Sequence, residues 1–166
     1  MNACETLRLQ ARYNAWMNAR LYAVCAPIPE ADRRRDLGAF FRSVHGTLNH
    51  ILLVDRLWAG RLAGRAPHFE GLDQILHEDF ATLRMRQAGA DADLQARVEV
   101  LRDADLERRV DYLSLMTGEA RSLRVGTLLT HLFHHQTHHR GQLTVLLTRL
   151  GVDFGETDLI WMEAVH

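Results

Sequence analysis

The chain has 166 residues, with 20 basic and 21 acidic side chains and a formal charge of −1. This length is typical of one domain, and 47% hydrophobic with 25% charged residues argues against a disordered or low-complexity chain. The balanced charge argues against a nucleic-acid partner, because proteins that coat nucleic acid carry a basic excess. No signal peptide is visible, and no apolar run reaches the ~18 residues of a membrane span. We therefore expect a cytoplasmic protein without a membrane partner.

Four long helices are predicted from apolar residues that recur at steps of three and four. They cover residues 4–25, 39–63, 72–102 and 125–150. Pro27 and Pro29 end the first helix, and Gly64 and Pro67 end the second. Gly151 stands where the C-terminal cap of the fourth helix is expected.

The segment between the third and fourth helices has a different pattern. Apolar residues on both sides of Thr117-Gly118 predict a β-hairpin over Arg109–Val125 that turns at Met116–Glu119. A short segment, Glu30–Arg35, follows the first helix, and the tail carries the apolar piece Leu159–Met162. The fold class predicted is all-α: one domain, residues 1–166, built as a four-helix bundle with a small hairpin-like excursion between helices three and four.

Histidines are concentrated in the last predicted helix. Five of the ten in the chain fall within nine residues: His131, His134, His135, His138 and His139. A projection at about 100° per residue puts His135 and His139 on or beside the apolar face. His131 falls at its margin, and the other two point outward. His135 and His139 are four residues apart, which is the spacing at which two imidazoles of one helix can bind one metal ion.

The second helix offers a third ligand, His50, in its most apolar stretch. Catalytic zinc sites commonly use three protein ligands, and a buried neutral imidazole needs partners for both ring nitrogens. We expect each ligand to donate its other ring N–H to a carboxylate, carbonyl or water. Asp55 is the candidate carboxylate near this site, and it could instead pair with Arg140 on the last helix. No glutamate lies inside the HxxxH spacing, which argues against a zinc peptidase.

Other interpretations of these residues remain open on spacing alone. A lone buried histidine is more often hydrogen-bonded than metal-bound, and a histidine-rich run can be a solvated helix face. Tyr13, Trp16, Trp58 and Trp161 could line the mouth of a pocket. Aromatic side chains at helical spacing are, however, more often part of a core.

Two stretches resemble the DinB family of damage-inducible bacterial proteins: SVHGTLNHILLVDRLWAGRL (Ser43–Leu62) and HLFHHQTHHRGQL (His131–Leu143). The segments RYNAWMNARLY (Arg12–Tyr22) and TDLI (Thr157–Ile160) are also similar. The resemblance therefore covers nearly the whole chain. It implies a four-helix bundle, often dimeric, that holds a divalent metal ion, commonly nickel or zinc.

In the family, the ion is bound by one histidine of helix two and an HxxxH pair on the last helix. By motif position these ligands are His50, His135 and His139, the three residues that the helical projection and burial select. One departure is His134, where the family often has asparagine.

The resemblance implies a metalloenzyme with an open metal position, either a thiol-dependent transferase or a metal-assisted hydrolase. Its partners would be a low-molecular-weight thiol and a small electrophilic substrate. The alternative is a non-catalytic stress-response protein whose metal is structural or incidental, which a closed fourth position would favour. A haem bundle is disfavoured, because two histidines four apart on one helix cannot supply opposite axial ligands.

Assembly as a homodimer is expected from the family resemblance and from the second helix. Its apolar residues spread around most of its circumference: Val44, Leu48, Leu52, Leu53, Val54, Leu57 and Trp58. Such a helix must be covered on more than one side. The hairpin and the tail could supply that cover within the chain instead.

Overall fold

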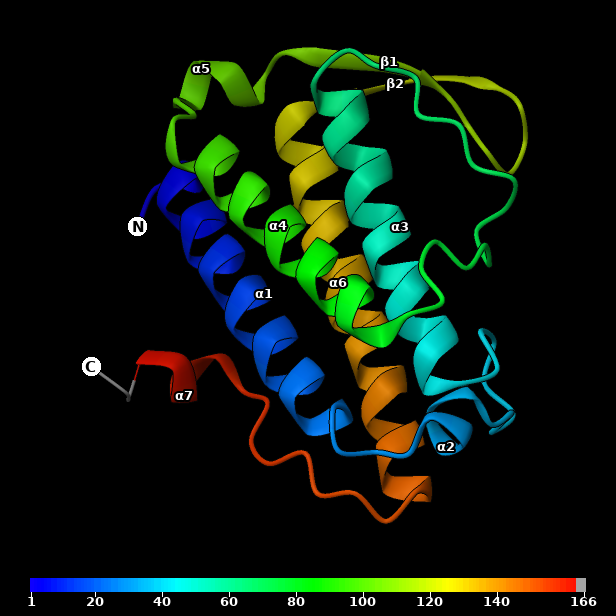
Figure 1. Ribbon diagram of the computed structural model, residues 1–166. Coiled ribbons are helices and arrows are strands. Elements are labelled where there is room, and N and C mark those ends of the chain that lie inside the picture. Colours follow the sequence, from blue (N-terminus) through cyan, green and yellow to red (C-terminus); the bar gives the residue numbers. More distant parts are fainter. Residues whose placement is uncertain (164–166) are drawn as a thin grey trace.

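The computed structural model describes residues 1–163, so residues 164–166 of the predicted domain lie outside the described residues. Four long helices form a bundle (Figure 1): α1 (Ala3–Cys25), α3 (Val44–Leu62), α4 (Phe80–Glu99) and α6 (Val125–Arg149). Both α1 and α3 pack against α4 and α6, so α1 and α3 lie diagonally opposite. The predicted four-helix bundle is confirmed.

Shorter elements close the ends of the bundle: α2 (Glu30–Arg34), α5 (Asp103–Leu106), β1 (Arg109–Leu113), β2 (Ala120–Arg124) and α7 (Leu159–Glu163). Strands β1 and β2 pair antiparallel, with Val110 opposite Leu123, and they lie across the end of the bundle beside the start of α6 (Figure 1). The predicted hairpin is therefore confirmed. Gly118 lies in its turn with a φ of 70°, a conformation that favours glycine.

Capping side chains set where the long helices begin. Asn2 precedes α1, Ser43 precedes α3 and Asp79 precedes α4. Each accepts a hydrogen bond from the backbone N–H three residues further on, at 2.8, 3.0 and 2.7 Å respectively. These bonds satisfy N–H groups that have no partner inside the helix. Gly151 follows the end of α6 with a φ of 71°, as predicted for its cap.

The second helix begins at residue 44, five residues later than predicted. Residues 37–42 form a turn instead, in which the Leu37 N–H donates to the carbonyl of Arg42 at 2.7 Å. Arg42 has a φ of 66°, which interrupts a right-handed helix. The turn packs so closely on α3 that a side chain at Gly46 would lie 2.2 Å from the carbonyl oxygen of Phe41.

The third helix begins at residue 80, eight residues later than predicted, and ends at 99 rather than 102. The loop that precedes it is held by polar side chains of α3. Asn49 Oδ1 accepts from the N–H groups of Leu76 and His77, each at 2.9 Å, and His50 Nδ1 contacts the Leu72 carbonyl at 2.7 Å. These bonds occupy backbone groups that a helix would need. Leu76 still packs against the core, which explains the misleading periodicity.

The apolar circumference of α3 is covered within the single chain. Every residue from which a dimer was predicted on this helix is buried. Besides α4 and α6, the hairpin strand β1 packs against α3. The hairpin thus supplies the cover that the competing explanation expected, whereas the tail helix packs on α1 instead. The homodimer stays a prediction from the resemblance.

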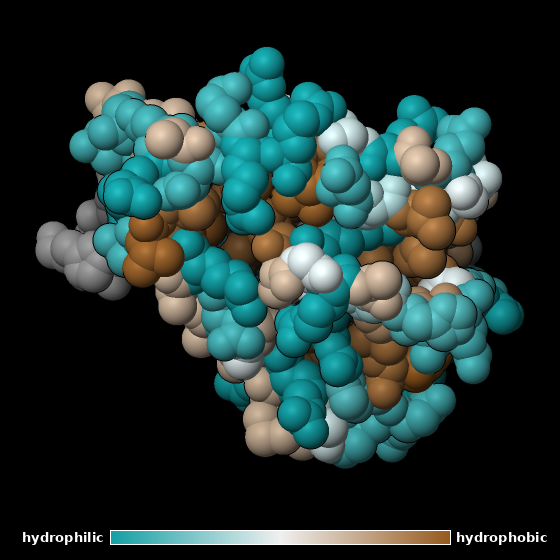
Figure 2. Space-filling model, turned by 90° about the horizontal axis from the view of Figure 1, so that it is seen from above, coloured by the Kyte–Doolittle hydropathy of each residue, from teal (hydrophilic) through white to brown (hydrophobic). Residues whose placement is uncertain are grey.

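The end of the molecule near the hairpin presents a mixed surface. Figure 2, which looks down on this end, shows a mostly hydrophilic face with separate hydrophobic patches. Leu113, Leu115 and Met116 of the hairpin are exposed. None of the helices within residues 1–163 combines the length and apolar character needed to span a membrane.

Candidate metal centre

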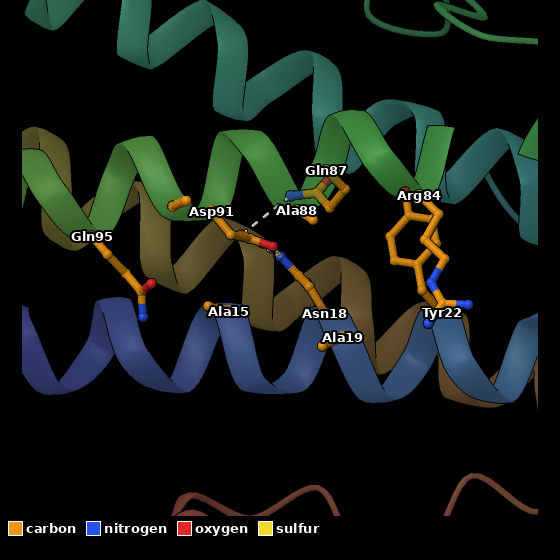
Figure 3. A pocket seen from close by; sticks show the side chains of 10 residues that line it. Ala15, Asn18, Ala19, Tyr22, Arg84, Gln87, Ala88, Asp91 and Gln95 are labelled. Atoms are coloured by element: carbon orange, nitrogen blue, oxygen red, sulfur yellow. Dashed lines mark hydrogen bonds between the residues drawn. The ribbon is translucent and has the colours of Figure 1, made fainter. Parts of the chain in front are cut away.

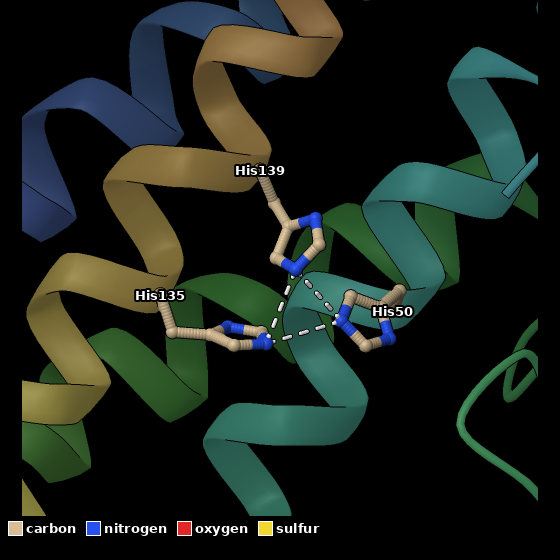
Figure 4. A group of neighbouring side chains, drawn as sticks. All are labelled: His50, His135 and His139. Atoms are coloured by element: carbon tan, nitrogen blue, oxygen red, sulfur yellow. Dashed lines mark hydrogen bonds between the residues drawn. The ribbon is translucent and has the colours of Figure 1, made fainter. Parts of the chain in front are cut away.

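Three histidines from two adjacent helices converge on one point. Figure 4 shows His50 on α3 facing His135 and His139 on α6, where the two lie one turn apart. The Nε2 atom of His50 is 3.3 Å from Nε2 of His135 and 3.2 Å from Nε2 of His139, and the latter two are 3.1 Å apart. The structure thus brings together all three predicted metal ligands.

The size of this triangle fits a metal ion. Nitrogen ligands lie about 2.0–2.1 Å from zinc, and at tetrahedral angles they stand about 3.3 Å from one another. The observed separations of 3.1–3.3 Å agree with that geometry. One ion could therefore contact all three Nε2 atoms without any movement of the helices.

Hydrogen bonds on the far side of two rings fix which nitrogen carries the proton. His50 Nδ1 lies 2.7 Å from the Leu72 carbonyl, and His139 Nδ1 lies 2.9 Å from Gln142 Oε1. Both partners are acceptors, so each Nδ1 carries a hydrogen and each Nε2 of a neutral ring presents a lone pair. Two lone pairs then face each other at 3.2 Å and repel unless a cation lies between them.

Burial keeps these imidazoles in the neutral form that binds metals. Removal from water lowers the pKa of His50 to about 4 and that of His135 to about 3, and it lowers the pKa of His139 as well. The neighbouring imidazoles lower the pKa of His135 further, because a second positive charge nearby is unfavourable. At neutral pH no proton has to be displaced from them when a metal binds.

The expectation that each ligand donates its other N–H is met by His50 and His139 but not by His135. The Nδ1 atom of His135 is buried and has no hydrogen-bond partner among the described residues. Its ring is instead held by the neighbouring rings, including that of His131, whose centroid lies 5.9 Å away.

Three groups that hold the ligands were not predicted from the sequence. The ring of Phe41 stacks on His50 with a centroid separation of 3.8 Å and meets His139 edge-on at 5.4 Å. Gln142 and the Leu72 carbonyl are the other two. A signal for Gln142 was available, because it lies three residues after His139 on one helix. Phe41 and Leu72 reach the site from loops whose paths the periodicity did not indicate.

A cavity of about 210 Å³ opens beside the triangle. His50 and His135 form part of its wall, together with Trp58, His131 and the hairpin residue Tyr112. Trp58 lines this cavity and is at the same time part of the buried core. The cavity therefore adjoins two of the three ligands.

Comparisons with known proteins agree with this architecture. The family model described as "DinB family" matches residues 2–166. The chain belongs to the DinB family. Protein DinB of Bacillus subtilis (strain 168) is 23% identical over 153 residues, which is 88% of this chain and 87% of the relative.

Two solved structures share the fold of this DinB-family chain. A DinB-like protein from Bacillus cereus ATCC 10987 has a TM-score of 0.64 and 18% identity, over 87% of this chain and 91% of that one. YfiT from Bacillus subtilis has a TM-score of 0.67 and 15% identity, over 90% of each chain. YfiT is described as a probable metal-dependent hydrolase with an unusual four-helix bundle topology.

The other aromatic candidates of this DinB-family chain lie away from the cavity. Tyr13 and Trp16 pack on each other on α1, with ring centroids 6.1 Å apart, and the Tyr13 hydroxyl donates to the carbonyl of Thr157 at 2.5 Å. Trp161 is in α7 and partly exposed. Placing Tyr13 and Trp16 at the pocket was wrong, because α1 lies diagonally across the bundle from α3.

Asp55 is buried, but it contacts none of the three ligands. It accepts hydrogen bonds from Gln87 of α4, at 2.7 Å, and from Gln136 of α6. Gln136 is adjacent in sequence to His135 and also donates to the carbonyl of Ile51, next to His50, so Asp55 is linked to the ligands only indirectly. Arg140 is also buried, yet it donates to Asn14 and Thr137 and forms no ion pair with Asp55. The alternative of a direct pair between Asp55 and Arg140 was therefore wrong.

A second buried carboxylate, Asp91 of α4, joins this network and was not predicted. Figure 3 shows its carboxylate meeting Asn18 of α1, with Gln87 on the same helix as Asp91. Asn18 donates to it at 2.9 Å and Asn14 at 3.0 Å. Burial raises the pKa of Asp55 and of Asp91, and the charge of Asp55 raises the pKa of Asp91 further. A sequence signal existed in two asparagines four residues apart between apolar positions of α1.

Proposed function

We propose that this protein is a metal-dependent enzyme that binds one divalent ion, nickel or zinc, through His50, His135 and His139. It would act on a small electrophilic substrate, as a thiol-dependent transferase or a hydrolase. The observation that carries the proposal is the pair of facing Nε2 lone pairs of His50 and His139, 3.2 Å apart, beside an open cavity. The similarity of the fold to that of YfiT, which is described as a probable metal-dependent hydrolase, supports this proposal.

An open ligand position separates this proposal from a purely structural metal. A closed structural zinc site needs a fourth protein ligand. Among the described side chains of residues 1–162, no further histidine, cysteine or carboxylate joins the group of three. The cavity beside His50 and His135 leaves room for a small molecule at that position.

The chain's own residues would position the reactants. When bound, the ion would supply a Lewis acid that polarises the substrate and activates a water or thiol nucleophile. Phe41 and the Leu72 carbonyl hold the His50 ring in place, and Gln142 holds His139. His131 lines the cavity, and partial removal from water lowers its pKa. The lowered pKa favours the neutral imidazole, which is the form that can accept a proton from the nucleophile.

Metal analysis of the purified protein tests the site. We expect one divalent ion per chain, lost in His50→Ala and in His139→Ala. His134→Ala is the matched control, because His134 is exposed on the same helix turn and should keep full occupancy. Full occupancy in both inward variants would show that the ligands are wrong.

The reaction is then sought with the metal-loaded protein. Small electrophiles are screened with and without several cellular thiols, and activity should depend on both the metal and His139. Turnover that requires a thiol would identify a transferase, and turnover in water alone would identify a hydrolase. Full activity of the His139→Ala variant would contradict the proposal.

A further inference from the structure

A buried arginine side chain, Arg61, forms part of the wall of the cavity beside the metal ligands. Arg61, in the last turn of α3, is only 7% exposed. Its guanidinium lies over the faces of two rings, 4.5 Å from the centroid of Trp58 and 4.2 Å from that of Tyr112. Its Nη2 atom donates to the carbonyl of Leu113 at 2.8 Å, which ties the hairpin to α3.

This cation has no counter-ion in the described part of the chain. No acidic side chain of residues 1–162 lies within ion-pair distance of Arg61, whereas exposed arginines such as Arg34 and Arg42 have such partners. A guanidinium carries five N–H donors, and buried arginines are normally paired. Removal from water lowers the pKa of Arg61, but an arginine keeps its proton at neutral pH.

The position of Arg61 relates it to the histidines. Arg61, His50 and His135 line the same cavity of about 210 Å³, and the wall around them includes the apolar side chains of Val54 and Leu57. Among the described residues the Leu113 carbonyl is the one hydrogen-bond acceptor of Arg61, so further N–H groups of the guanidinium remain for a ligand. A planar carboxylate matches two such donors at once.

We propose that Arg61 binds a carboxylate of the small molecule that occupies this cavity. The ligand would have a short apolar body and one carboxylate, held away from the three histidines. The inference rests on the proposed function in one respect only: the end of the ligand opposite the carboxylate, which would react, faces the three histidines. Binding of the carboxylate itself needs no metal, so the two can fail separately.

Ligand titration followed by two-dimensional NMR of the full-length, metal-free protein tests the proposal. The probes are 3-phenylpropionate and its neutral analogue 3-phenylpropanamide. The acid should bind at least about tenfold more tightly than the amide, because a hydrogen-bonded charge contributes about 1.5–3 kcal/mol. Arg61→Gln should weaken binding of the acid by about 10- to 100-fold and leave the amide unchanged.

Two further variants separate recognition from a structural role. Arg56→Gln, an exposed arginine on the same helix, should bind both probes like the unaltered protein. Arg61→Lys keeps the charge but not the two-donor geometry, so it should retain part of the preference for the acid. It also provides the test if Arg61→Gln does not fold. Equal binding of acid and amide, or undiminished binding of the acid by Arg61→Gln, would overturn the proposal.

The carboxylate could belong either to the thiol or to the electrophile. The zinc-loaded protein is used to distinguish these two sources. 3-Mercaptopropionate and 3-phenylpropionate are titrated into the unaltered protein and into Arg61→Gln. A larger loss of affinity for the mercapto acid than for the phenyl acid in Arg61→Gln assigns the carboxylate to the thiol, and a larger loss for the phenyl acid assigns it to the electrophile. Arg61→Gln should bind zinc normally, which separates this test from that of the metal site.

Discussion

The absence of a side chain at Gly46 lets the turn that carries Phe41 pack closely on α3 beside the metal ligands. An ideal Cβ at this position would stand 2.2 Å from the Phe41 carbonyl oxygen and 3.4 Å from Ser43 Oγ. Real contacts of this kind are not shorter than 3.0 Å, so the turn must move away from α3 in Gly46→Ala. The ring of Phe41, which stacks on His50 at 3.8 Å, would move with it.

Two effects of opposite sign decide the stability of Gly46→Ala. Alanine in place of a helical glycine gains up to about 1 kcal/mol, whereas overpacking costs about 1–3 kcal/mol. Because backbone rather than a flexible side chain blocks the methyl group, we expect the larger cost and a net loss of about 1–2 kcal/mol. For a chain of this size, that lowers Tm by roughly 2–8 °C.

Urea denaturation and a zinc competition titration measure the two consequences. Gly89→Ala is the matched control: it is also helical, nothing lies within 4 Å of its Cβ, and it should stabilise the protein by up to about 1 kcal/mol. Zinc affinity should fall about tenfold in Gly46→Ala, since residues that orient a ligand affect affinity by about 10- to 100-fold. If both variants gain stability equally, the close approach of the turn to α3 is refuted.

Three further results are expected. Gln142→Leu, which removes the acceptor of His139 Nδ1, should weaken zinc binding by about 10- to 100-fold in the same titration, with His138→Ala as a milder control. The raised pKa of Asp55 and Asp91 means that the folded protein holds more protons than the unfolded chain, so stability should fall as pH rises from about 4 through the raised values. Asp91→Asn should flatten that slope in urea denaturation between about pH 5 and pH 8. Light scattering across micromolar concentrations should give twice 19.0 kDa for the predicted homodimer, and 19.0 kDa throughout would contradict it.

Features that depend on local pattern could be predicted from the sequence. The four helices follow from apolar residues at steps of three and four, and the hairpin follows from Thr117-Gly118 between apolar segments. His135 and His139 were identifiable because their spacing places both rings on the apolar face of one helix. His50 could be chosen because a polar imidazole in the most apolar stretch of α3 requires a partner.

Features that depend on contacts between distant segments could not be predicted from the sequence. The helix start at residue 80 follows a loop whose backbone is bound by Asn49 of α3, and the start at residue 44 follows the turn in which the Leu37 N–H donates to the Arg42 carbonyl. Asp55 was placed near the ligands, although its partners are set by how α4 and α6 cross α3. Tyr13 was misplaced for the same reason. A helical projection shows which face is apolar but not which neighbour covers it.

The buried polar network has a consequence for how the helices align. It joins all four long helices at one level of the bundle, through Asn18 of α1, Asp55 of α3, Asp91 of α4 and Gln136 of α6. Gln136 also donates to the backbone of α3 at 3.1 Å, one residue from each of two metal ligands. Apolar side chains tolerate sliding, whereas a shift of α3 by a single residue, about 1.5 Å, would break these hydrogen bonds. The network therefore fixes the axial register of the helices, and it keeps the imidazole of His50 on α3 level with those of His135 and His139 on α6.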